Sequence, residues 1–171
     1  MTPGIQELLR QNERLCDGFR RDLLVVRDVE AAMTATAPET SLVNLPMRTG
    51  APDRAGLYRY LAQDLVPHLP ADLSVRRASR TTDRFRVVEE LLVGFTFDRE
   101  MPWLLPGAAA TGRVVEVLAI SVTTVRQGKI AAQRTLWDQF GLLDRLGLPP
   151  GALKTAEPAA PTGPDAPPGR W

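Results

Sequence analysis

Three ionisable side chains lie at the ends of apolar runs, where a pocket could use them for acid/base chemistry. Asp138 directly follows Trp137, Asp98 ends a long apolar segment, and His68, the only histidine, stands between two prolines. A carboxylate beside an indole in an apolar cup is poorly solvated, which raises its pKa. A base closer to neutrality is suited to removing a proton from carbon between two carbonyls. We therefore predict Asp138 as the acid/base, Asp98 as a second acid and His68 as a proton shuttle.

Each of these three residues also has an ordinary structural interpretation. Asp138 precedes a short helical pattern, so its carboxylate is equally suited to cap that helix. Asp98 could cap a turn in the same way, and a histidine in a loop is commonly a surface residue. The sequence leaves both interpretations open for all three positions.

Aromatic and amide side chains supply the candidate binding surface. Asn44 interrupts an apolar segment, so its amide could donate to a substrate carbonyl or enolate, or could satisfy a neighbouring backbone group. Trp103 lies in a loop bounded by prolines, where it could line the mouth of a pocket. The predicted substrate-binding residues are Asn44, Tyr58, Phe97, Trp103, Arg134, Leu136 and Trp137.

Composition and missing motifs exclude several function classes. The formal net charge is +1, which gives no basic excess for nucleic acid. One histidine and scattered carboxylates form no metal-ligand cluster, and no phosphate-binding glycine loop is present. Cys16 is the only cysteine, and we expect it to be a small core residue and not a nucleophile. Neither a signal peptide nor a membrane-spanning run is visible, so we expect a cytoplasmic protein without metal, cofactor or membrane partner.

The elements that would position these residues follow from periodicity and turn signals. Helices come first, followed by long strands rich in valine, leucine and threonine, and then by a closing helix. The expected helices cover 5–33, with a bend or break near Gly18, then 53–65 and about 139–146; the expected strands cover 41–45, 73–82, 85–97, 114–125 and 129–137. This order predicts an α+β domain over residues 1–150, with helices on one face of a curved sheet around an apolar pocket. Residues 151–171 are rich in proline and are expected to form a disordered tail.

Short motifs in this order carry a resemblance to a known family. They are Leu42-Val-Asn-Leu-Pro46, Val66-Pro-His-Leu-Pro70, the run from Phe95 through Met-Pro-Trp103 to Gly107, and Trp137-Asp-Gln139 before Gly141-Leu-Leu143. Together they resemble the SnoaL-like polyketide cyclases of the nuclear transport factor 2-like (NTF2-like) superfamily. The resemblance implies a cone-shaped α+β barrel in which N-terminal helices pack on a strongly bent, mainly antiparallel sheet. It also implies a homodimer that uses no metal or organic cofactor.

Three function hypotheses follow from the residues and the resemblance. The first is a cofactor-independent cyclase, or a related lyase or isomerase, that acts on a polyketide-like, carbonyl-rich small molecule. The second is a non-catalytic small-molecule-binding or dimerisation module, because Phe97, Ala132 and Arg134 replace titratable residues common among relatives. The third is an epoxide hydrolase in which Asp138, Asn44 and Arg134 hold a water.

Overall fold

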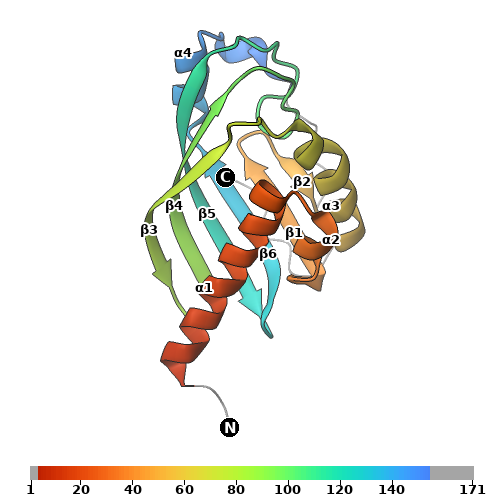
Figure 1. The fold of residues 1–171 in the computed structure, drawn as a ribbon, viewed down its shortest axis with the longest axis vertical. Helices are drawn as coiled ribbons and strands as arrows, with labels where there is room; N and C mark the ends of the chain where they lie inside the picture. The colour runs from red at the N-terminus through yellow and green to blue at the C-terminus, as the bar shows by residue number, and fades with distance from the viewer. Residues whose placement is uncertain (1–3, 155–171) are drawn as a thin grey trace.

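The computed structural model describes residues 4–154 and begins with a helical stretch that is interrupted before the first strand of the chain (Figure 1). Helix α1 (Ile5–Arg21) buries Asn12, Cys16 and Phe19, which recur at helical spacing on one face. A π-helical turn (Asp22–Val26) follows, and Arg27 then adopts a left-handed conformation. Helix α2 (Val29–Met33) restarts with the Asp28 side chain as its N-cap. The long helical stretch predicted here is therefore in two pieces, with the break after residue 26 and not near Gly18.

Six strands form a single curved sheet in the order β2-β1-β6-β5-β4-β3. Only the β1–β6 pair is parallel, and the other four pairs are antiparallel. The strands are β1 (Thr36–Leu45), β2 (Thr49–Ala51), β3 (Ser74–Thr82), β4 (Arg86–Thr96), β5 (Val114–Arg126) and β6 (Lys129–Trp137). The predicted hairpins are confirmed, whereas β1 begins at Thr36, earlier than the predicted residue 41.

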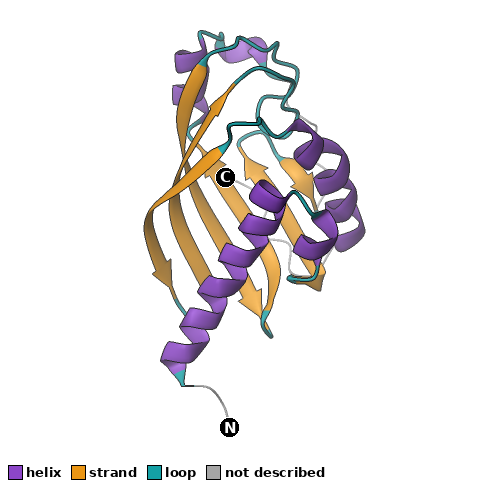
Figure 2. Cartoon of the chain, in the orientation of Figure 1, coloured by secondary structure: helices purple, strands orange, loops and turns teal. Residues whose placement is uncertain are grey.

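The helices near the N-terminus cover the concave face of this sheet (Figure 2). Helix α3 (Arg54–Tyr60) continues into a π-helical turn (Leu61–Leu65) and a 3-10 turn (Val66–His68). Its predicted apolar stripe is buried, because every third or fourth side chain turns toward the sheet. The concave face and these helices enclose the core, and within residues 4–154 no layer of helices covers the convex face of the sheet.

The last described elements close one end of the sheet. Helix α4 (Gln139–Leu146) ends at Gly147, which adopts φ 68°, the left-handed conformation that favours glycine. A 3-10 turn (Pro150–Ala152) follows, and Leu153 packs against the core. Residues 151–154, which the prediction assigned to the tail, are thus among the described residues. The rest of the predicted tail, residues 155–171, lies outside the described residues.

Candidate functional site

A cavity lies between the concave face of the sheet, helix α1 and the segment that follows helix α3. Its wall is mainly apolar and includes Phe19, Leu42, Leu91 and Val93. Its volume, counted as space open to the centre of a water molecule, is about 100 Å³. A single water needs only about 10–15 Å³ on this measure. The cavity therefore has room for a small organic molecule.

A buried amide organises the polar end of this cavity. The Asn44 side chain, on β1, is 7% exposed and lines the cavity. Its Nδ2 donates to the Tyr60 hydroxyl oxygen at 2.9 Å and to Thr49 Oγ1 at 3.3 Å. Its Oδ1 accepts from Trp137 Nε1 at 3.1 Å, and the Thr49 hydroxyl donates to the Trp103 carbonyl at 2.6 Å. Asn44 therefore ties together strands β1 and β6 and helix α3.

Two polar groups at this end could serve a ligand. Burial raises the pKa of Tyr60, while hydrogen bonds with Thr49 and Asn44 offset part of that effect, so the phenol is neutral in the folded protein. The Trp103 indole lines the cavity, is 4% exposed, and packs edge-on against Trp137 with ring centroids 5.7 Å apart. Among the described residues, its Nε1–H has no hydrogen-bond partner. A buried donor without a partner costs free energy, which a ligand oxygen would recover.

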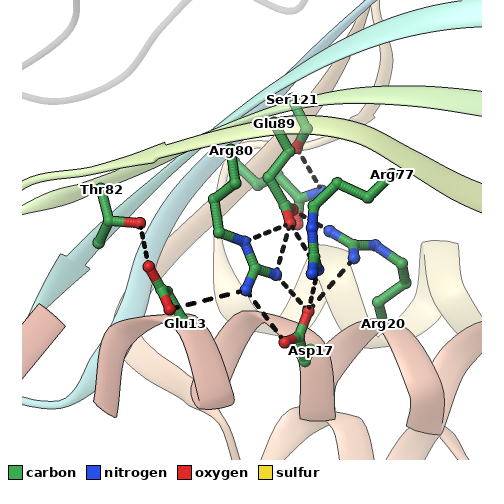
Figure 3. A network of polar contacts seen from close by, with 9 residues as sticks. Glu13, Asp17, Arg20, Arg77, Arg80, Thr82, Glu89 and Ser121 are labelled. Atoms are coloured by element: carbon green, nitrogen blue, oxygen red, sulfur yellow. Dashed lines mark hydrogen bonds and ion pairs between the residues drawn. The ribbon is translucent and has the colours of Figure 1, made fainter. Parts of the chain in front are cut away.

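A network of charged side chains lies between α1 and the sheet (Figure 3). Glu89 of β4 is 1% exposed and accepts hydrogen bonds from Arg20 and from Arg80, whose Nε lies 2.9 Å from Glu89 Oε1. Arg80 and Arg77 also pair with Asp17 of α1, at 3.1 Å for Arg77. The guanidinium groups thus bridge a carboxylate on the sheet to one on the helix. This network fixes α1 against the sheet at one side of the cavity.

Arg20, a member of this network, and the neighbouring Cys16 both line the cavity. Among the described residues that line the cavity, Arg20 is the only charged one. Desolvation raises the pKa of the Cys16 thiol to about 11, and the charge of Glu89 adds to that effect. Cys16 is therefore a neutral, small core side chain at physiological pH, as predicted.

Asp138 does not face the cavity, which corrects the prediction on which the acid/base assignment depended. Its side chain is exposed, and its Oδ1 accepts a hydrogen bond from the Gly141 amide at 3.0 Å as the N-cap of α4. The reason is strand alternation: Trp137 points inward, so the next residue leaves the sheet on the other side. The capping interpretation therefore describes the geometry, and the Asp138 side chain lies at the surface and not in an apolar cup.

Replacing Asp138 with alanine should therefore change stability and leave ligand binding intact. Loss of an N-cap side chain costs about 1 kcal/mol, so the free energy of unfolding should fall by about that amount in urea titrations. Asp144, which is exposed on the same helix, offers a matched control, and Asp144→Ala should change stability by less. A fall in small-molecule affinity in the Asp138 variant alone would restore a role in the pocket.

Asp98 and His68 also lie away from the cavity wall. Asp98 is exposed and pairs with Arg99 at 2.8 Å, an interaction that lowers the pKa of the carboxyl. His68 is half-buried in a 3-10 turn, and its Nδ1 lies 3.1 Å from the Asp64 carbonyl oxygen. The structure does not bring these two side chains together with each other or with Asp138 in the cavity.

Of the predicted binding residues, Asn44, Trp103 and Trp137 line the cavity and the other four do not. Tyr58 is exposed and donates to Glu30, and Phe97 is buried in the core away from the cavity wall. Arg134 and Leu136 are exposed on the convex face, because they alternate with Gln133, Thr135 and Trp137 along β6. The prediction identified the correct strand and mixed its two faces.

Several residues of the site were not predicted. Tyr60 belongs to the apolar stripe of α3 that the sequence pattern identified, so its helical position already indicated an inward direction. Glu89 precedes Glu90 in an apolar strand, and only the strand register decides which of the two is buried. Arg20 gave no signal of its own, because its neighbours indicated a solvated helix face.

Residues 4–154 contain neither a metal-binding cluster nor a helix that could span a membrane. No group of three or more histidine, cysteine, aspartate or glutamate side chains is placed to hold a metal ion. No helix in this part of the chain has both the length and the apolar character that a membrane span requires.

Comparisons with known proteins find relatives by structure alone. No family model matches the chain, and no curated protein matches it in sequence. A protein provisionally named as a SnoaL-like polyketide cyclase, from Jannaschia sp. CCS1, matches with a TM-score of 0.66 and 16% identity, covering 88% of this chain and 98% of that one. A protein provisionally named as a polyketide cyclase, from Acidithiobacillus ferrooxidans, matches with a TM-score of 0.65 and 17% identity, covering 80% and 94%.

A third similar structure is described as having a ketosteroid isomerase-like fold. It is a protein from Catenulispora acidiphila with a ketosteroid isomerase-like fold, in complex with trimethylamine, and it matches with a TM-score of 0.60 and 14% identity, covering 79% of this chain and 93% of that one. The chain therefore has the ketosteroid isomerase-like fold of the NTF2-like proteins, and the predicted α+β cone is confirmed. At these identities the likeness establishes the fold, and this fold carries many different functions.

Proposed function

We propose that this protein is a SnoaL-like member of the NTF2-like superfamily that binds a mainly apolar, carbonyl-bearing small molecule in the cone. The observation that carries the proposal is the buried Trp103 indole N–H, which has no partner among the described residues and belongs to a residue that lines an apolar cavity. Apolar walls with a few convergent polar groups are typical of small-molecule sites. A carbonyl oxygen is the simplest group that matches this donor beside Tyr60 and Asn44.

Cyclisation or isomerisation of the bound molecule is the second candidate. The solved structures named as polyketide cyclases share the fold, and the neutral Tyr60 phenol could donate to a developing enolate oxygen. No carboxylate or histidine is among the described residues that line the cavity, so a base is missing from this wall. The proton leaving carbon would therefore pass to a water molecule, and the protein would contribute by holding the carbonyl groups close together and polarising one of them.

Epoxide hydrolysis is disfavoured, because its three predicted residues do not meet. Asn44 faces the cavity, whereas Arg134 and Asp138 are exposed outside it. These side chains cannot hold one water between them.

Calorimetric titration with α-tetralone, a bicyclic ketone, tests the binding proposal. The wild-type chain should bind it, and Leu42→Trp should weaken binding at least tenfold, because the indole would fill the cavity that Leu42 lines. Val43→Trp is the matched control, since Val43 is the next residue on β1 and points to the convex face. Thermal unfolding of both variants verifies that they fold. Absence of binding to the wild-type chain, or equal loss in both variants, would refute the proposal.

We also propose that the chain forms a homodimer through the convex face of the sheet. Leu45, Leu136 and Ile120 are paired in one row across this face, and Leu136 is 55% exposed. Glu90 of β4 continues this row beside Ile120, and Arg134 lies two residues before Leu136 on β6, so both signs of charge lie next to the apolar residues. A two-fold interface needs such a self-complementary surface, with an apolar centre and mixed charges at its rim.

Ile120→Lys should convert the dimer to a monomer, because the change places two like charges in the centre of the interface. Light scattering coupled to size-exclusion chromatography measures the mass directly. Tyr58→Lys serves as the control, since Tyr58 is exposed on α3, which covers the opposite side of the sheet. A monomeric wild-type chain at micromolar concentration would contradict the proposal.

A further inference from the structure

A row of polar side chains crosses the concave face of the sheet, although strands around it are mainly apolar. The register pairs Thr49 with Asn44, Asn44 with Thr135, Thr135 with Ser121, Ser121 with Glu89, and Glu89 with Arg80. Directly paired residues point to the same face of a sheet. The row therefore runs across all six strands, from the Asn44 group at one end to the charged network at the other.

The two ends of this row are already satisfied. Asn44 uses both its amide nitrogen and its oxygen in hydrogen bonds, and Glu89 accepts from Arg20 and Arg80. Neither end therefore requires a ligand for its own hydrogen bonding.

The two hydroxyls in the middle of the row are different. Thr135 is 6% exposed and lines the cavity; within residues 4–154 its hydroxyl makes no hydrogen bond and is not among the fully enclosed polar atoms. Ser121 is 2% exposed and accepts from Gln133 Nε2 at 3.3 Å, while its own proton has no acceptor in the described part of the chain. Buried polar groups in proteins are nearly always paired with protein, water or ligand. This pair of hydroxyls is thus able to bind oxygen atoms from inside the cavity.

We infer that Thr135 and Ser121 form a second anchor, which binds a second oxygen of the ligand. The first anchor is the Trp103 indole with Tyr60 and Asn44. Asn44 and Thr135 lie on adjacent strands, which are about 4.8 Å apart, and Ser121 lies one strand further. The ligand class is therefore a compact, mainly apolar molecule with at least two carbonyl or hydroxyl oxygens. This inference rests on the proposed function, because it assumes that the cavity binds a ligand.

Paired probes separate the two anchors in calorimetric titrations of the full chain. α-Tetralone has one oxygen, and 5-hydroxy-α-tetralone adds a hydroxyl on the far ring. The wild-type chain should bind the hydroxy derivative about three- to tenfold more tightly, the range expected for one additional hydrogen bond. Thr135→Val and Ser121→Ala should each remove most of this gain and leave affinity for α-tetralone unchanged. Thr135→Ser, which keeps the hydroxyl, should retain the gain.

Thr40→Val is the matched control for these variants. Thr40 lies on β1, is fully buried, has a hydroxyl without a partner among the described residues, and does not line the cavity. The Thr40→Val variant should therefore still bind 5-hydroxy-α-tetralone more tightly than α-tetralone, as the wild-type chain does. Binding of neither probe to the wild-type chain would overturn the proposed function itself. Binding of both probes with no preference, or with a preference that survives Thr135→Val, would overturn the second anchor alone.

Discussion

Replacing Glu89 with glutamine should lower the free energy of unfolding by about 3 kcal/mol, measured by urea titration. The carboxylate is 1% exposed and pairs with Arg20 and Arg80, so its neutralisation leaves these largely buried guanidinium groups with the more exposed Asp17 as their anion. Removal of one partner from a buried ion pair costs about 3–5 kcal/mol, and glutamine keeps part of the hydrogen bonding.

Glu90→Gln provides the matched control for this change. Glu90 is the next residue on β4, lies on the convex face and accepts only from Ser79 among the described side chains, at 3.1 Å. Surface changes of this kind stay within about 0.5 kcal/mol. Equal stability losses in the two variants would mean that the buried network does not hold α1 on the sheet.

Asn44→Leu should lower both stability and ligand affinity. The change leaves the Trp137 indole N–H and the Tyr60 hydroxyl without the partner they share. Each buried polar group left unpaired costs about 1–3 kcal/mol, so a loss of about 2–4 kcal/mol is expected in urea titrations. Affinity for α-tetralone should fall about tenfold, because Tyr60 and Trp137 at the polar end lose their orientation.

Asn12→Leu separates these two effects. Asn12 is 3% exposed on α1 and donates to the Asp83 and Arg84 carbonyls, away from the cavity. Its loss should reduce stability by a comparable amount and leave affinity unchanged. A fall in affinity with Asn12→Leu equal to that with Asn44→Leu would show that the Asn44 effect is only a loss of stability.

Local patterns predicted the architecture of this chain because each local signal agrees with the fold. The turn at Gln127-Gly128 has positive φ at both residues, as a tight hairpin requires, and the alternation along β4 and β5 matches their burial. The stripe of α3 likewise gave the correct buried face. What periodicity could not supply was the long-range register that brings Arg20, Arg80 and Glu89 together.

The site was predicted less well than the fold, and β6 shows why. In a strand, neighbouring residues point to opposite faces, so a set containing Arg134, Leu136 and Trp137 together could not all be correct. Trp137 points into the cavity, so Gln133 and Thr135, which lie four and two residues before it on the strand, point there as well. The same argument places Asp138 outside, where it caps α4.

The described residues of the cavity wall include hydrogen-bond donors and no carboxylate. This wall offers Trp103, Tyr60 and the hydroxyls of β5 and β6, which can bind and polarise oxygen atoms. The general base predicted from the sequence is not among the lining residues. Binding of an oxygenated apolar molecule is therefore the primary proposal, and chemistry on that molecule is a second step that depends on it.

A crystal structure of the chain soaked with α-tetralone tests the central claim most directly. The proposal predicts electron density for the ketone inside the cone, with its oxygen about 3 Å from the Trp103 indole nitrogen. Density on the convex face only, or an oxygen that points away from Trp103, Tyr60 and Asn44, would contradict it.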